Sequence, residues 1–289
     1  MRAVDAFRDI LTSRADPRMA ALCRIVVGAA AVLELATSGP MMVRFFAEAA
    51  IVPARNFEWL LAPTPSGAVA LVVIGLLAAV GFSAGFLTRS SGIILAGTMG
   101  YRLVLDQNLY SNHAYLLVLV AFLLVLADAG AAFSLDRRLG WKQASDIPNW
   151  PLTLIRVQVS LIYLFAGLAK LNSVFLSGQV LEAHSRLPAI VGTGYGLVLA
   201  AWLVVLWELF QTGALWFPKL RGVAFIGGLL FHGSIVLLMK PFPSEGLIVF
   251  GIVTLACYLL FVDLRPAITG HHPYVPNKPL STRPGQLSA

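Results

Sequence analysis

The stretch NHAYLLVLVAFLLVLAD, residues 112–128, places an asparagine and a histidine directly before a long apolar run. Mostly apolar runs of about 17–25 residues are long enough to cross a bilayer as a helix, and such runs recur along this chain. The 289 residues are 58% hydrophobic and 12% charged, whereas a soluble globular domain is about 25% charged. The sequence therefore predicts an all-α, polytopic integral membrane helical bundle.

Helix start signals and apolar runs divide the chain into about eight expected transmembrane helices. Asp16 as an N-cap and Pro17 at the first helical position mark the start of the first one. Residues 1–17 are expected to form an amphipathic segment at the membrane interface, and residues 264–289 a polar, Pro-rich tail. The expected spans cover approximately residues 18–36, 66–87, 91–105, 112–133, 149–172, 194–216, 222–239 and 245–262.

The distribution of basic residues predicts that both termini are cytoplasmic. Connections on the side of the termini hold 13 lysines and arginines, against 4 on the opposite side, and positive charge is enriched on the cytoplasmic side of membrane proteins. The net charge of +7 therefore reflects membrane topology rather than a nucleic-acid partner. In this topology His113 and Lys170 both lie at the outer ends of their spans.

Ionisable groups within spans are costly and by default mark functional sites or paired contacts. Lys170 in apolar surroundings could act as a neutral base, or its ammonium could extend to the membrane interface. His113 could accept a proton from a ligand or hydrogen-bond to it, or it could bond a loop carbonyl. Asn112 could be the N-cap of the helix that carries His113. On the residues alone these alternatives stay open.

Tyr163 and Arg156 precede Lys170 by seven and fourteen residues, which places all three near one stripe of a helix. Ala166 and Gly167, one turn below Lys170, are small enough to let a neighbouring helix or a flat ligand approach closely. Arg102 and Arg156 are expected to pair with an acidic residue within the bundle. The candidates are Glu34, Asp106, Asp128 and Glu208.

The sequence indicates neither a metal site nor a disulfide. Glu208 and His232 are both expected in mid-span, but no H-x-x-H, E-x-x-H or C-x-x-C spacing accompanies them. Cys23 and Cys257 lie far apart in different expected spans, so both are interpreted as packing residues.

Two segments together carry a family resemblance: LYSNHAYLLVLVAFLLVLADAGAAFSLD, residues 109–136, and LIRVQVSLIYLFAGLAKLNSVFLSG, residues 154–178. In this order they resemble the membrane domain of vitamin K-dependent γ-carboxylase and its bacterial relatives, the horizontally transferred transmembrane (HTTM) domain proteins. Supporting pieces are RIVVG, WELFQTGALWFPKLR and FHGSIVLLM. The resemblance implies one transmembrane domain over residues 18–263 and a place in the bacterial cytoplasmic (inner) membrane.

The resemblance implies that Lys170 is the base that deprotonates a hydroquinone of the vitamin K or menaquinone type. It also implies that His113 supports this reaction together with Asn112, and that O2 and, for carboxylation, CO2 are co-substrates. Residues implied in cofactor binding are Asn112, Arg156, Gln158, Tyr163 and Gly167.

The resemblance places this epoxidation or carboxylation chemistry on the extracytoplasmic side, in the maturation of a secreted peptide. The animal carboxylase has a large lumenal domain after its membrane helices, whereas only a short tail follows the last expected span here. We therefore expect chemistry on a reduced quinone rather than carboxylation of glutamate, unless a separate extracytoplasmic protein supplies the peptide. Two alternatives stay open: a non-catalytic membrane component that binds a partner protein or lipid, and a small-solute transporter.

Overall fold

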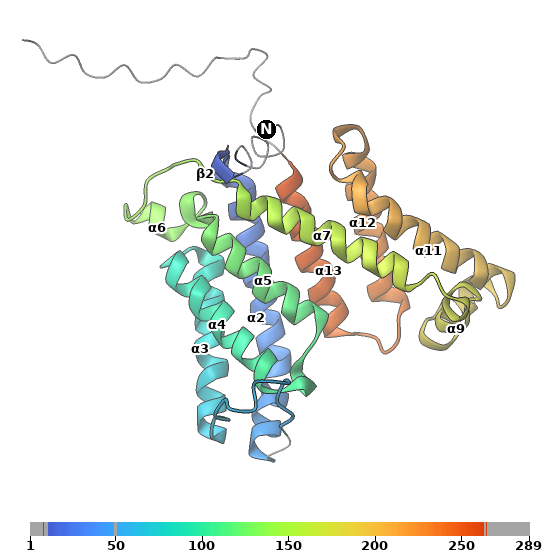
Figure 1. Cartoon of the computed structure of the whole chain (residues 1–289), viewed down its shortest axis with the longest axis horizontal. Helices are drawn as coiled ribbons and strands as arrows, with labels where there is room; N and C mark the ends of the chain where they lie inside the picture. Colours follow the sequence, from blue (N-terminus) through green and yellow to red (C-terminus); the bar gives the residue numbers. More distant parts are fainter. Residues whose placement is uncertain (1–7, 9–10, 49–50, 263, 265–289) are drawn as a thin grey trace, which may run out of the picture.

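The structure is a computed structural model that describes residues 8, 11–48, 51–262 and 264. A helix lies at each of the eight places where the sequence predicts a span (Figure 1). These helices are α2 (Pro17–Ala47), α3 (Pro65–Ala84), α4 (Thr88–Leu105), α5 (Asn112–Leu126), α7 (Trp150–Ala169), α11 (Tyr195–Ala214), α12 (Pro218–Leu238) and α13 (Glu245–Tyr258).

The connections hold short helices and one small pair of strands. β1 (Arg14–Ala15) pairs antiparallel with β2 (Ile147–Pro148), with Arg14 opposite Pro148 and Ala15 opposite Ile147. The short helices are η1 (Gln107–Leu109), η2 (Ala129–Ala131), α6 (Leu135–Arg138), α8 (Ser173–Leu176), α9 (Gln179–His184), α10 (Pro188–Val191) and η3 (Leu259–Phe261).

Within the described residues, five helices are long and apolar enough to cross a membrane. They are Pro17–Phe46, Pro65–Ala84, Trp150–Ala169, Tyr195–Ala214 and Pro218–Leu238. α5 and α13 are apolar but have only 15 and 14 residues. α4 carries Arg89 and Arg102 together with several hydroxyl side chains. The all-α membrane fold is therefore supported, whereas eight spans and cytoplasmic termini stay predictions.

The first helix starts where the sequence predicts and ends later. The Asp16 carboxylate accepts a hydrogen bond from the Arg18 N–H at 2.9 Å, and Pro17 is the first helical residue. The expected end near residue 36 is wrong, because α2 continues through Pro40 to Ala47. The Thr37 hydroxyl donates to a carbonyl one turn back, so this polar segment is satisfied within the helix.

The fourth helix is shorter than its apolar sequence predicts. α5 ends at Leu126 because Asp128 adopts a left-handed backbone conformation with φ of 61°. The Asp128 carboxylate pairs with Arg89 at 3.3 Å and with Lys142. These charges lie at the end of the bundle, in the first turn of α4 and in the loops after α5, which explains why the helix stops before residue 133.

Two groups of helices pack around a shared element. α2, α3, α4 and α5 contact one another in sequence, and α7 packs on α11. α13 contacts α2 and α5 of the first group as well as α7 and α12 of the second, so it lies at the centre of the molecule (Figure 1). The free thiols of Cys23 on α2 and Cys257 on α13 are buried in this centre, in agreement with their interpretation as packing residues.

The two ends of the described chain meet at one end of the bundle. The Asn149 N–H donates to the Ser13 carbonyl at 3.1 Å, beside the strand pair. The Arg156 Nε donates to the carbonyl of Leu260 in η3 at 2.7 Å. The expected amphipathic segment at residues 1–17 and the tail at 264–289 fall largely outside the described residues, so these domain boundaries stay predictions.

Candidate functional site

Lys170 follows the last residue of α7 and forms an ion pair with Glu208 of α11. Its Nζ lies 2.8 Å from Glu208 Oε1 and 2.9 Å from Oε2, and it also donates to the Ala166 carbonyl at 3.2 Å. Glu208 is 5% exposed, and the Lys170 side chain is 28% exposed. Lys170 is therefore held by a buried carboxylate and does not extend freely to an interface.

Gly167 explains how α7 and α11 come close enough for this pair. A Cβ atom at Gly167 would lie 2.9 Å from Leu209 Cδ2 and 3.5 Å from Glu208 Cβ. The small residue thus admits the neighbouring helix, one of the two alternatives that the sequence leaves open, and a part of Gly167 in cofactor binding stays a prediction. The Trp216 Nε1 donates to the Ser160 hydroxyl at 2.8 Å, so the end of α11 lies beside the middle of α7.

A second group of buried polar side chains lies around Tyr163 on the same face of α7. The Tyr163 hydroxyl is 2.7 Å from His232 Nε2 on α12 and 2.5 Å from the Tyr258 hydroxyl on α13. Gln211, one turn after Glu208 on α11, donates from Nε2 to the Tyr258 hydroxyl at 2.8 Å. We call these residues and the ion pair the polar cluster: Tyr163, Lys170, Glu208, Gln211, His232 and Tyr258.

Three buried polar atoms near this cluster have no hydrogen-bond partner within the described residues. They are Gln211 Oε1, Trp207 Nε1 and Thr254 Oγ1. An unsatisfied buried donor or acceptor costs about 1–3 kcal/mol, and such groups in native proteins often have a functional reason. The unused oxygen of Gln211 is therefore an acceptor that the fold leaves available inside the cluster.

His113 belongs to a separate ion-pair group at the start of α5. Its Nε2 is 3.1 Å from Glu34 Oε2 of α2, and Arg102 of α4 donates to Glu34 Oε1 at 2.7 Å. The helix is capped by Ser111, whose hydroxyl accepts from the Ala114 N–H at 3.3 Å. Asn112 is already helical, which corrects the expectation that it is the N-cap.

A cavity of about 380 Å³ opens beside His113. A Cβ atom at Gly246 of α13 would lie 2.7 Å from His113 Cε1, so the imidazole packs directly on this glycine. Phe250, one turn further along α13, lines the cavity and lies 5.8 Å from the His232 ring. α13 thus joins the cavity to the polar cluster. The lining residues are Asn112, His113, Ser244, Gly246, Leu247 and Phe250.

A known protein family matches most of the chain. The HTTM domain matches residues 13–264, which include the ion pair, the polar cluster and the cavity. The chain belongs to the HTTM domain family. This HTTM domain is thus a membrane protein of a family related to vitamin K-dependent carboxylase. No solved structure matches the chain.

Two other predicted binding residues of this HTTM domain lie away from Lys170. Arg156 donates from Nη1 to Asn149 Oδ1 at 3.2 Å, in addition to its bond to η3. It precedes Lys170 by fourteen residues, which is about 21 Å along a helix, so it serves the opposite end of α7. Gln158 is half-buried and adjoins the buried stripe of α7 that includes Val159 and Tyr163. Neither joins the polar cluster of the HTTM domain.

Sequence reasoning missed part of the polar cluster of this HTTM domain. Glu208 was expected to pair with an arginine and instead pairs with Lys170, whereas Arg102 pairs with Glu34 as expected. Gln211 and Tyr258 were not singled out. The available signal was the segment WELFQ, which places Glu208 and Gln211 one turn apart in an otherwise apolar helix.

Proposed function

We propose that this HTTM domain is an integral membrane enzyme that uses a lipid-soluble reduced quinone with O2. Lys170 is the proton acceptor and His113 the supporting residue. The observation that carries the proposal is the ion pair between Lys170 and the buried Glu208. A buried pair of charges is often no more stable than an apolar pair, so its presence here favours a chemical role.

The ion pair can present a neutral amine without leaving a charge in the bundle. If the ammonium of Lys170 passes a proton to Glu208, both groups become neutral and the penalty for burying charge disappears. Lys170 Nζ then has a free electron pair and can accept a proton. Once Lys170 has accepted a proton, the pair holds one proton more than the resting ion pair, so Glu208 must release its proton to solvent before the ion pair forms again.

The cavity beside His113 fits the ring of a hydroquinone in size and chemistry. A pocket of this kind combines apolar walls with few polar groups. Leu247 and Phe250 supply the walls, and His113, Asn112 and Ser244 supply hydrogen-bonding groups. When bound, a reduced quinone would supply the electrons for the reduction of O2. His113 and Asn112 would orient its hydroxyl groups.

The polar cluster holds a chain of hydrogen bonds that begins at His232, near the cavity, and ends at Gln211, near Glu208. Phe250 separates the cavity from His232, which shares a hydrogen bond with Tyr163. The chain of hydrogen bonds continues through Tyr258 to Gln211, one turn from Glu208. Each hydroxyl in this chain can donate and accept, so it can pass a proton by reorientation.

The wider setting of the proposal follows from the charge distribution and the resemblance. The site faces the extracytoplasmic side of a bacterial inner membrane, and a quinone enters from the bilayer. The product chemistry serves the maturation of a secreted peptide, and CO2 is a further co-substrate if a separate extracytoplasmic protein presents a glutamate. The proposed partners of the HTTM domain are the lipid bilayer, the quinone, the secreted peptide and the separate extracytoplasmic protein.

The test compares purified wild type with Lys170→Gln/Glu208→Gln in lipid with reduced menaquinone or vitamin K. The double variant removes both charges and keeps hydrogen-bonding groups of similar shape, so it should fold. Quinone epoxide, followed by mass spectrometry, is expected from wild type and not from the variant. The matched control is Asp128→Asn/Lys142→Gln, which removes an ion pair of the loops and should leave turnover unchanged. Epoxide from no protein, or equally from all, contradicts the proposal.

One observation favours a second candidate function, a non-catalytic component that binds a partner protein or lipid. Tyr163, His232 and Tyr258 satisfy one another, as they would in a purely structural core. In that case the double variant at Lys170 and Glu208 would change stability or partner binding while wild type forms no epoxide. The same assay therefore separates the two candidates.

A further inference from the structure

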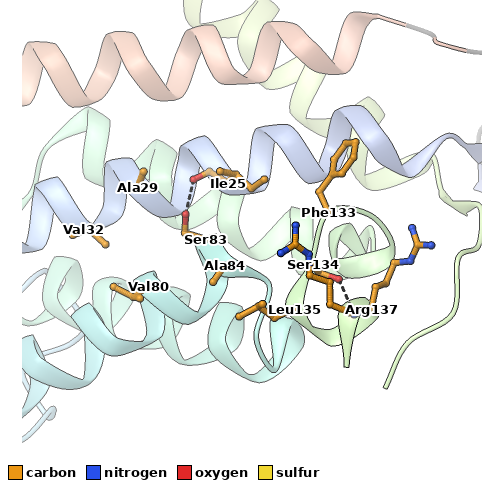
Figure 2. A pocket seen from close by; sticks show the side chains of 11 residues that line it. Ile25, Ala29, Val32, Val80, Ser83, Ala84, Phe133, Ser134, Leu135 and Arg137 are labelled. Carbon is orange, nitrogen blue, oxygen red and sulfur yellow. Dashed lines mark hydrogen bonds between the residues drawn. The ribbon is translucent and has the colours of Figure 1, made fainter. Parts of the chain in front are cut away.

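An apolar groove lies between α2 and α3, away from the polar cluster. Its volume is about 900 Å³. Figure 2 shows Ile25, Ala29 and Val32 of α2 facing α3, with Phe133 and Arg137 at one end of the groove. Ser134 and Arg138 also line the groove at that end.

The two helices touch at the floor of the groove. The Ser83 hydroxyl donates to the Ile25 carbonyl at 2.9 Å (Figure 2). A Cβ atom at Gly28 would lie 2.6 Å from Ser83 Cβ, so this glycine is needed for the close approach. Ala29 and Ala84 present only methyl groups above the floor, which keeps the groove open. The result is an apolar channel on a helix pair that can face the bilayer.

One end of this channel carries unneutralised positive charge. Arg137 and Arg138 are exposed, and in the described part of the chain neither guanidinium makes a hydrogen bond or ion pair. Behind them Arg24 is fully buried and donates to the carbonyls of Phe82 at 3.2 Å and Phe133 at 2.6 Å. Among the described residues its Nε has no hydrogen-bond partner.

Among the described residues, the one carboxylate at this end is already used by the protein. Asp136 accepts from the Leu87 N–H at 2.7 Å, and from the Thr88 N–H at 2.8 Å and hydroxyl at 2.6 Å. It therefore faces the loop before α4 and does not pair with an arginine of the groove. Three arginines against one occupied carboxylate leave a net positive end.

We propose that this groove binds one acyl chain of an anionic phospholipid, with the headgroup phosphate on Arg137 and Arg138. The apolar channel matches a hydrocarbon chain, and the paired guanidinium groups match phosphate oxygens. Basic pockets between transmembrane helices recognise anionic headgroups in this way. Free phosphate would contact only the arginines and leave the channel empty. Binding at this site therefore requires both the acyl chain and the headgroup of the lipid.

Native mass spectrometry of the purified protein can test this site with phosphatidylglycerol and phosphatidylcholine as probes. Wild type is expected to retain phosphatidylglycerol at least tenfold more than phosphatidylcholine. Arg137→Gln/Arg138→Gln is expected to abolish that preference, because it removes two exposed charges. Ala29→Trp is expected to reduce retention of both lipids at this site by filling the channel.

Two matched variants control for net charge and for bulk. Arg55→Gln/Lys219→Gln removes two exposed basic residues that do not line the groove, and Val73→Trp adds a tryptophan at an exposed position of α3 outside the groove. Both should bind phosphatidylglycerol as wild type does. Equal retention of the two lipids by wild type overturns the proposal. Unchanged lipid binding by either groove variant also overturns it. So does a gain in the thermal stability of wild type from inorganic phosphate that equals the gain from phosphatidylglycerol.

Discussion

Lys170 Nζ uses all three of its N–H donors on buried or half-buried acceptors, two of which are the carboxylate oxygens of Glu208. The distances are 2.8 and 2.9 Å to Glu208 and 3.2 Å to the Ala166 carbonyl. An ammonium has three donors and no acceptor. Chemistry at Lys170 therefore requires Glu208 to take a proton or to move, and this makes Glu208 as important as Lys170.

Glu208→Gln should reduce quinone turnover strongly while the protein stays folded. The amide preserves the size of the side chain but cannot accept the proton of Lys170. General acid–base groups contribute about 10²–10⁴-fold to rates, so a fall of about 10²-fold or more is expected. Initial rates of epoxide formation in lipid measure it, with retained thermal unfolding as the control for folding. A rate within twofold of wild type would remove Glu208 from the mechanism.

Glu34→Gln should be among the most destabilising single changes in the molecule. Arg102 and Glu34 side chains are only 2% and 5% exposed, and the variant leaves the guanidinium charge buried without a counter-ion. Breaking a buried ion pair from one side costs about 3–5 kcal/mol. The exposed pair of Arg44 and Glu48 provides the control, because Glu48→Gln should cost at most about 1 kcal/mol. Thermal unfolding in detergent compares the two, and equal losses would contradict this account.

Gly167→Ala should loosen the contact between α7 and α11. The added methyl group would meet Leu209 Cδ2 at 2.9 Å, and overpacking of this kind costs about 1–3 kcal/mol. We expect a lower unfolding temperature and slower quinone turnover, since Lys170 lies less than one turn away. Gly97→Ala on α4 is the matched control, because a Cβ atom there meets nothing within 4 Å. A variant at Gly167 as stable as this control would show that the helices do not need the glycine.

Asp136 should make stability depend on acid pH. Burial disfavours its charged form, but hydrogen bonds from Thr88 and the Leu87 N–H lower its pKa below the ordinary value of 3.8. A lowered folded pKa means that the contribution to stability is complete above pH 3.8 and is lost as pH falls through the folded pKa. Wild type should therefore lose this contribution below about pH 4.

Asp136→Asn provides the comparison for this pH dependence. The variant should be less stable than wild type at neutral pH. Its unfolding temperature should also fall less than that of wild type between pH 5 and pH 3. This pH range brackets the ordinary pKa of aspartate, which is about 3.9. Unfolding temperatures of both proteins over that range measure the difference. Parallel curves would show that this carboxylate does not titrate differently in the folded protein.

The predicted topology can be checked with single cysteines, since both native thiols are buried. Ser145→Cys lies in an exposed loop expected to be cytoplasmic, and Thr193→Cys lies in an exposed loop expected to be outside. In intact cells a membrane-impermeant maleimide should label the cysteine at position 193 and not the one at 145. The reverse pattern would place both termini outside the cell and Lys170 on the cytoplasmic side.

Sequence reasoning located the helices because their signals are local. Apolar runs, the Asp16 cap and Pro17 act within a few residues, so the starts of α2 and α13 were close to prediction. Helix ends were less predictable. The end of α5 depends on Asp128 meeting Arg89 and Lys142 across loops, and such partners are distant in sequence.

The candidate site was only partly predictable for the same reason. Lys170, His113 and Tyr163 stand out as polar groups in apolar runs, and the structure places each in a buried network. Their partners could not be read from spacing, because Glu208 pairs with Lys170 through a helix contact that Gly167 permits. Arg156 shares a helical stripe with Lys170 in sequence, but the length of α7 separates the two residues.

The central claim is that the ion pair of Lys170 and Glu208 serves oxygen-dependent chemistry on a reduced quinone. Turnover of reduced menaquinone or vitamin K under ¹⁸O₂ tests it most directly, with mass spectrometry of the quinone product. The account predicts ¹⁸O-labelled epoxide from wild type and from Asp128→Asn/Lys142→Gln, and none from Lys170→Gln/Glu208→Gln. Unlabelled quinone from wild type, or equal label from the folded double variant at Lys170 and Glu208, would contradict it.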